Sequence, residues 1–144
     1  MKTAGYSKRT LVEKLGIKEG HQNLVINPPD DYKKILGNFP QALQFEKEYR
    51  DLEFKDTYDF IQFFVTSQEA LQEMFPTLKK HLSKTGMLWI SWPKGAYCNF
   101  VGSDLNENII RDIGLADGLV DIKVIAVDEN WSGLKFVYRL KDRS

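Results

Sequence analysis

The residues best suited to bind a ligand lie in four polar segments that each follow or join apolar runs. The segments are residues 27–31 (Asn-Pro-Pro-Asp-Asp), 66–67 (Thr-Ser), 91–94 (Ser-Trp-Pro-Lys) and 128–131 (Asp-Glu-Asn-Trp). Open α/β sheets bind ligands beyond the carboxyl ends of their parallel strands, so such a sheet would gather these segments at one edge, the rim. The candidate ligand-binding residues of the rim are Asn27, Ser67, Trp92, Lys94, Asp128, Glu129 and Trp131.

The rim side chains suit a small anionic or nucleotide-like ligand. Lys94 could bind a phosphate or a carboxylate, or could pair with Asp128 or Glu129. Trp92 and Trp131 could stack on a planar group. Alternatively, the tryptophans cover the end of the sheet and Lys94 is solvated. The sequence leaves both interpretations open.

Covalent and acid–base chemistry have weaker support. Asp128 and Glu129 are adjacent, and adjacent residues of an extended chain point to opposite faces, which favours a turn over a carboxylate pair. Either Thr66 or Ser67 is expected to cap a helix, and no histidine lies near them in sequence to activate a hydroxyl. Cys98 has no identified base. The catalytic residues, if any, stay unknown.

Composition argues against metal, nucleic-acid and membrane partners. The 144 residues include one cysteine and two histidines, too few for a thiolate zinc site. Lys plus Arg and Asp plus Glu both number 20, so the net charge of +0 provides no overall positive field for nucleic acid. No run approaches the ~20 apolar residues of a membrane-spanning helix, and no secretory signal pattern is visible. We therefore expect a cytoplasmic protein.

Strands are predicted by short runs of apolar and β-branched residues. The runs are residues 24–26, 58–65 and 87–92, with a weaker one at 42–49. Residues 120–127 and 134–140 predict a closing antiparallel hairpin, because only a short polar segment separates them. An exposed edge at 134–140 would permit a homodimer.

Helices are predicted between the strands in the first half of the chain. Ser7 is expected to cap a short helix that ends at Gly16, where a left-handed residue fits. Asp30 or Asp31 is expected to cap a second short helix that closes near Gly37.

Two further helices are predicted in the second half. Residues 66–69 form a capping-box pattern before a helix that Pro76 is expected to kink or divide. Asp104 and Glu107 form a second such pattern. Residues 94–103 are expected to form a loop. Strands alternating with helices predict one α/β domain over residues 1–144, with a mostly parallel sheet between two helical layers.

The order of elements, with residues 15–20 before the first strand, resembles the S-adenosylmethionine-dependent methyltransferase fold. Residues 4–7 (Ala-Gly-Tyr-Ser), 88–94 (Leu-Trp-Ile-Ser-Trp-Pro-Lys) and 127–135 (Val-Asp-Glu-Asn-Trp-Ser-Gly-Leu-Lys) look like the recurring blocks of an uncharacterised bacterial family of small single-domain proteins. The resemblance implies a three-layer Rossmann-like (methyltransferase-like) sandwich, mostly parallel with a C-terminal antiparallel hairpin. It implies no activity, because one fold supports many functions.

The loop after the first strand differs from what the methyltransferase resemblance implies. Those enzymes have a glycine-rich loop there, because the backbone approaches the cofactor closely where no Cβ intervenes. Residues 27–31 instead carry two prolines and two carboxylates, so we predict no cofactor and disfavour S-adenosylmethionine. An acidic residue after the second strand often holds the ribose in the related enzymes, and Glu46 or Glu48 could fill that place.

Two functions therefore compete. The first is a non-catalytic or regulatory module with a degenerate methyltransferase-like fold that lacks the glycine-rich cofactor loop. The second is a small enzyme or ligand-binding protein that uses the rim for a small anionic or nucleotide-like ligand. The expected partner is a small molecule or a protein.

Overall fold

A six-stranded mixed sheet forms the centre of the computed structural model, which describes residues 9–54 and 56–143. The strand order is β2-β1-β3-β4-β6-β5. The pairs β1–β2, β1–β3 and β3–β4 are parallel, and β6 runs antiparallel to both β4 and β5. The strands are β1 (Asn23–Ile26), β2 (Gln44–Glu46), β3 (Tyr58–Phe64), β4 (Leu82–Pro93), β5 (Leu119–Ala126) and β6 (Trp131–Tyr138). The predicted mostly parallel α/β sandwich with a C-terminal hairpin is confirmed.

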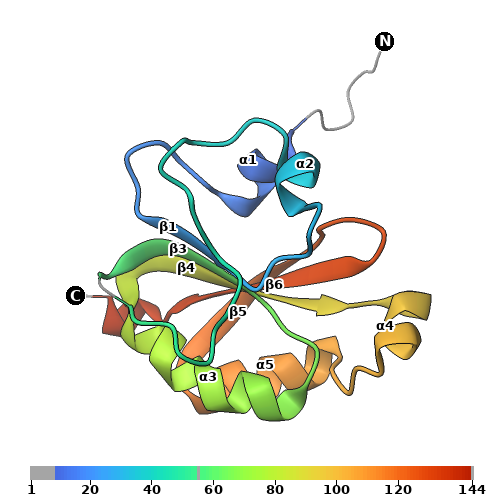
Figure 1. Ribbon diagram of the computed structural model, residues 1–144. Coiled ribbons are helices and arrows are strands. Elements are labelled where there is room, and N and C mark those ends of the chain that lie inside the picture. Colours follow the sequence, from blue (N-terminus) through green and yellow to red (C-terminus); the bar gives the residue numbers. More distant parts are fainter. Residues whose placement is uncertain (1–8, 55, 144) are drawn as a thin grey trace.

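Helices lie on both faces of the sheet (Figure 1). The short helices α1 (Leu11–Leu15) and α2 (Tyr32–Leu36) lie over one face, called here the α1 face. The longer helices α3 (Gln68–Lys80) and α5 (Glu107–Ala116) cover the opposite face, the α3 face. Helix α4 (Gly95–Val101) follows β4, and a 3-10 turn (Leu140–Asp142) follows β6. None of the helices in the described residues is long and apolar enough to cross a membrane.

The sheet separates two hydrophobic clusters. Leu15, Val25 and Trp89 belong to the cluster on the α1 face, whereas Phe63 and Ile90 belong to the cluster on the α3 face. Strand β3 contributes to both because it lies between parallel neighbours and under helices on each side. The Trp89 indole Nε1–H donates to the Leu15 carbonyl over 2.8 Å, which joins α1 to the sheet.

Helix α1 begins at a residue other than the one predicted. Thr10 is its N-cap and accepts a hydrogen bond from the Glu13 amide, while the Glu13 carboxylate accepts from the Thr10 amide at 2.8 Å. The predicted cap, Ser7, lies outside the described residues. The predicted end is correct, since Gly16 has a φ of 90°.

The other predicted caps were partly wrong. Asp31 precedes α2, but its side chain makes no capping hydrogen bond. Asn106, in place of Asp104, caps α5 by accepting from the Ile109 amide, because Asp104 already accepts from the Gln68 amide at 2.8 Å. Helix α3 continues through Pro76, whose side chain is exposed, so the predicted division is also wrong.

Several predicted strand boundaries also change. Strand β4 begins at Leu82 instead of residue 87, and β2 covers three residues in place of eight. Residues 95–101 form α4, where a loop was predicted. Strand β6 lies between β4 and β5, so the edge predicted at residues 134–140 is wrong. The edge strand is β5, because the hairpin inserts its second strand next to β4.

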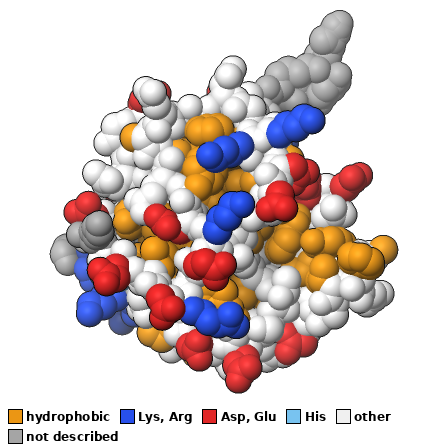
Figure 2. Space-filling model, in the orientation of Figure 1, with side chains coloured by type: hydrophobic (Ala, Val, Ile, Leu, Met, Phe, Trp, Pro, Cys, Tyr) orange, Lys and Arg blue, Asp and Glu red, His pale blue; other side chains and the backbone are white. Residues whose placement is uncertain are grey.

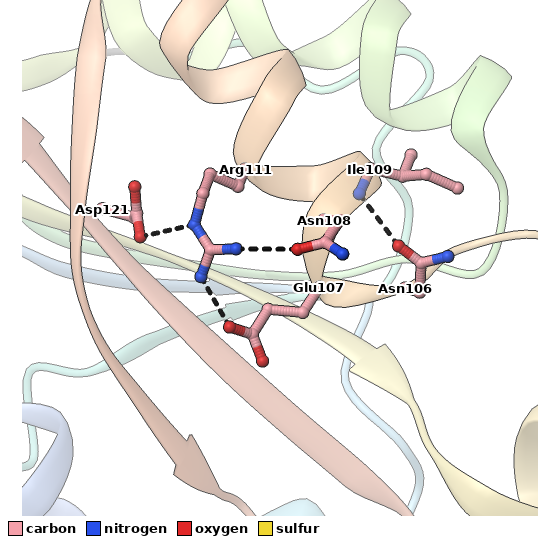
Figure 3. A network of polar contacts seen from close by, with 6 residues as sticks. All are labelled: Asn106, Glu107, Asn108, Ile109, Arg111 and Asp121. Atoms are coloured by element: carbon pink, nitrogen blue, oxygen red, sulfur yellow. Dashed lines mark hydrogen bonds and ion pairs between the residues drawn. The ribbon is translucent and has the colours of Figure 1, made fainter.

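A charged network joins α5 to the edge strand β5 (Figure 3). The Arg111 guanidinium donates to the Asp121 carboxylate at 2.8 Å, to Asn108 at 3.0 Å and to Glu107 at 2.5 Å. Arg111 presents a planar set of donors, so it can bind all three acceptors at once. The network directs the Asp121 carboxylate of β5 to the α3 face.

Replacement of Phe63 by alanine tests the central position of β3. Phe63 is fully buried, so Phe63→Ala is expected to lower the free energy of unfolding by about 3–5 kcal/mol in a urea titration. The control is Phe100→Ala, since Phe100 is 84% exposed and its loss should change stability by less than about 0.5 kcal/mol. A loss below about 1 kcal/mol for Phe63→Ala would contradict the placement of this strand.

Candidate functional site

The rim is formed by the carboxyl ends of the parallel strands together with the β5–β6 turn. Pro93 at the end of β4 pairs with Trp131 at the start of antiparallel β6, which places residues 128–131 next to Lys94. The Lys94 amide donates to the Asn130 carbonyl at 2.9 Å. The structure therefore brings two of the four predicted segments into direct contact.

The two rim tryptophans lie on opposite faces of the sheet. Trp92 belongs to the cluster on the α3 face and Trp131 to the cluster on the α1 face. They are 6% and 7% exposed, respectively. The pair cannot stack on one planar ligand, because successive residues of a strand point to opposite faces and Trp92 pairs with Ser132, the residue after Trp131.

The acidic residues of the turn serve its backbone. One carboxylate oxygen of Asp128 accepts from the amides of Asn130 and Trp131, each at 2.8 Å. Glu129 is exposed. Among the described residues, Lys94 forms no ion pair with either carboxylate. Asp128 therefore shapes the turn, the alternative that its spacing had favoured.

Asn27 and Ser67 hold the ends of β1 and β3. Asn27 has a φ of 59°, in the left-handed region that asparagine tolerates better than most residues. Its side-chain amide donates to the Phe64 carbonyl at 2.8 Å, which bridges the two strand ends. The Ser67 hydroxyl caps α3 by accepting from the Ala70 amide at 3.1 Å.

Aromatic side chains fill the α1 face of the rim. Phe64 at the end of β3 meets the ring of Tyr32 at 4.8 Å and that of Trp131 at 5.1 Å, both edge to face. Tyr97 of α4 extends the group, with its ring 5.6 Å from Trp131. These side chains pack against one another on the α1 face, at the carboxyl end of β3.

A buried chain of hydrogen bonds runs beneath this aromatic group. The Tyr32 hydroxyl donates to Gln62 Oε1 at 2.5 Å, and Gln62 Nε2 donates to Ser91 Oγ at 3.0 Å. Burial raises the pKa of the Tyr32 phenol far above its ordinary value, and the Asp128 charge adds to that shift. Tyr32 therefore stays protonated and acts as a donor.

Sequence reasoning missed this chain, although one signal was present. Gln62 stands in the middle of the apolar run 58–65, where a polar side chain without a partner would be costly. Its partners lie 30 and 29 residues away in sequence, so spacing could not identify them.

A cavity of about 320 Å³, called here the β1–β2 cavity, lies beside the end of β2 and the start of α2. It is lined by Pro29, Asp30, Tyr32, Lys33, Phe45 and Lys47, among others. The Lys47 ammonium lies 3.9 Å from the Asp30 carboxylate, and the Lys33 ammonium lies 4.8 Å from the centre of the Phe45 ring. The cavity thus combines a carboxylate, two cations and an aromatic side chain.

The cavity residues at the end of β2 were not predicted, because the sequence does not determine the register of this weak strand. Phe45 and Lys47 line the cavity, and alternation turns Glu46 between them away from it. The Glu46 carboxylate instead accepts from the Gln44 side chain at 2.9 Å. Glu46 is therefore not placed to hold a ligand in this cavity, and Glu48 does not line it.

Charged side chains of both signs are interspersed over the visible face of the molecule (Figure 2). A hydrophobic surface at the right of this view lies over α4, where Phe100 is 84% exposed. This distribution agrees with the net charge of +0 and offers no single-sign field on that face.

No family model and no curated protein matches the sequence. The resemblance to the uncharacterised bacterial family therefore stays a prediction, and its residues 4–7 lie outside the described ones.

Solved structures with a similar fold are methyltransferases or bind their cofactor. The N-methyltransferase NodS from Bradyrhizobium japonicum shares 14% identity over 88% of this chain and 90% of its own, with a TM-score of 0.61. Magnesium protoporphyrin IX methyltransferase from Synechocystis with bound SAH shares 15% over 74% of this chain, with a TM-score of 0.53. LepI in complex with SAM shares 10% over 90% of this chain, with a TM-score of 0.56.

These likenesses define a class of fold. The arrangement of the sheet and helices is similar to the methyltransferase fold. The chain spans 56% of the magnesium protoporphyrin IX methyltransferase and 39% of LepI, and the identities of 10–15% carry the fold alone.

Removal of the Tyr32 hydroxyl tests the buried hydrogen-bond chain. Tyr32→Phe leaves Gln62 Oε1 without a donor, so it should lower the free energy of unfolding by about 1–3 kcal/mol at neutral pH. The control Tyr97→Phe removes a hydroxyl from a half-buried ring and should change stability by less than about 0.5 kcal/mol. Equal stabilities of the two variants would show that the Gln62 contact contributes nothing.

The same variant should change the response to alkaline pH. The pKa of Tyr32 is raised on folding, so its stabilisation is full below the ordinary tyrosine value of 10.0 and declines as pH rises above it. The stability difference between wild type and Tyr32→Phe should therefore narrow above pH 10, measured by urea titrations across that range. A constant difference would contradict the inferred protonation.

Proposed function

We propose that the protein binds a small nucleotide-like anionic ligand in the β1–β2 cavity. The observation that carries the proposal is the position of a 320 Å³ cavity at the carboxyl ends of parallel strands β1 and β2. This is the edge at which open α/β sheets bind ligands, and nucleotides above all.

The side chains of the cavity match the parts of a nucleotide. The Asp30 carboxylate can accept hydrogen bonds from ribose hydroxyls, and the Phe45 ring can contact a planar base. Lys33 and Lys47 can bind a phosphate or carboxylate. The Asp30–Lys47 pair is exposed and loose at 3.9 Å, so a ligand can replace it at little cost.

Pro28 and Pro29 restrict how the ligand is held. Proline has no backbone N–H, so these residues cannot donate to an anion as a glycine-rich loop does. The anionic group of the ligand must then be bound by side chains, chiefly those of Lys33 and Lys47. SAM and SAH, which the titles of two similar structures name, are the first nucleoside compounds to test.

The second candidate is a non-catalytic or regulatory module, favoured by the contacts made at the carboxyl ends of β1 and β3. From β1 the chain continues to β2 on one side and then to β3 on the other, so the strand order reverses between β1 and β3. Open α/β sheets bind ligands at such a reversal. Asn27 bridges the strand ends there, and Tyr32, Phe64 and Trp131 pack above them. A module that binds a partner without catalysing a reaction needs no open ligand site at these strand ends, which agrees with the side chains packed there.

The test is a calorimetric titration with SAM, SAH and ATP. At least one compound should bind saturably, and the double variant Lys33→Ala, Lys47→Ala should weaken it about tenfold or more, since bonds to charged groups are lost. The matched control is Lys141→Ala, an exposed lysine distant in the fold from the cavity, which should bind as wild type does.

A third variant distinguishes binding in the β1–β2 cavity from binding at Lys94 and residues 128–131. Lys94→Ala should leave binding unchanged, because Lys94 does not line the cavity. Loss of binding in this variant alone would move the site to Lys94 and residues 128–131. If none of the three compounds binds, the cavity proposal fails. Formation of SAH from SAM would exclude the non-catalytic candidate.

A further inference from the structure

A second group of basic side chains lies at the opposite side of the sheet from the β1–β2 cavity. Arg9, Lys14 and Lys18 come from α1 and its flanks, and Lys123 and Lys135 come from β5 and β6. We call these five residues the basic shelf. Arg9, Lys14 and Lys123 line a cavity of about 360 Å³ whose other walls are Ile125 and Ala126.

The strand register of the hairpin places like charges next to each other. Lys123 and Lys135 are direct partners in the β5–β6 register. Like charges directly opposite on neighbouring strands destabilise a sheet. Burial lowers the pKa of half-buried Lys135, and the charges of Lys123 and Lys18 lower it further.

Two carboxylates of these elements, Glu13 and Asp121, are engaged elsewhere. The Glu13 carboxylate accepts from the Thr10 amide and hydroxyl in the cap of α1. The Asp121 carboxylate of β5 is bound by Arg111 from α5 on the other face (Figure 3). Within residues 9–54 and 56–143, the shelf lysines form no ion pair with a carboxylate.

We propose that the basic shelf binds a small polyanion that carries two or more phosphate groups. Arg9 and Lys14 from the α1 segment and Lys123 from β5 line one cavity, and lysine ammonium groups bind phosphate as point charges. Bound phosphate would offset the repulsion between Lys123 and Lys135. The apolar walls are Ile125 and Ala126, so the cavity has no aromatic surface on which a nucleic-acid base could stack.

The test uses inorganic tripolyphosphate as the probe in calorimetric titrations at low salt. Wild type should bind it saturably, and the double variant Lys123→Gln, Lys135→Gln should bind about tenfold more weakly or worse. The matched control is Lys80→Gln, Lys141→Gln, which removes two exposed lysines that line neither this cavity nor the β1–β2 cavity and should leave this binding unchanged. The shelf variant without ligand should melt at a temperature equal to or above that of wild type, because a repulsion is removed.

Comparison with ATP and RNA defines the class of ligand. ATP binding that the shelf variant weakens as much as it weakens tripolyphosphate binding supports recognition of the phosphates alone. No saturable tripolyphosphate binding, or an equal loss in both double variants, would overturn the proposal. Affinity for single-stranded RNA that grows with its length beyond that for tripolyphosphate would also overturn it. The proposal is independent of the β1–β2 cavity, because the two sites use different lysines.

Discussion

The hydrogen bonds of Gln62 constrain the whole α1 face of the structure. An amide side chain in the middle of a strand buried on both faces must find partners inside the protein, since no water reaches it. Tyr32 and Ser91 supply them, and so fix α2 above the sheet and β4 beside β3. Because α2 is held there, the Tyr32 ring packs on Phe64 and forms one wall of the β1–β2 cavity.

The strand order places two groups of charged side chains at the two opposite edges of the sheet. The β1–β2 side carries Asp30, Lys33 and Lys47 around a cavity of mixed charge. The β6–β5 side carries the basic shelf, while Arg111 binds the Asp121 carboxylate on the α3 face beyond the register shift between Asp121 and Lys123. A net charge of +0 therefore conceals a local excess of positive charge, and only the three-dimensional arrangement shows where it lies.

The methyltransferase-like fold is kept here with a different loop at its ligand edge. Packing of β3 and β4 between helical layers needs apolar residues of suitable size, which many sequences can provide, so 14% identity suffices for the likeness to NodS. Loops at the strand ends carry no such packing requirement and can change freely. Asn27 makes the turn after β1 without glycine, and its side chain bridges the ends of β1 and β3.

The sequence by itself determined the α/β class, the buried strands, the hairpin and the C-cap at Gly16, because apolar periodicity and turn chemistry are local. It also indicated that Asp128 serves a turn. Only the tertiary structure decided that Trp92 and Trp131 face opposite sides, that Thr10 and Asn106 are the caps, and that Lys47 instead of Glu46 faces the cavity. Those outcomes depend on strand register and on partners distant in the chain. A shift of one residue in a strand moves every side chain to the other face of the sheet. Local sequence patterns cannot specify that register.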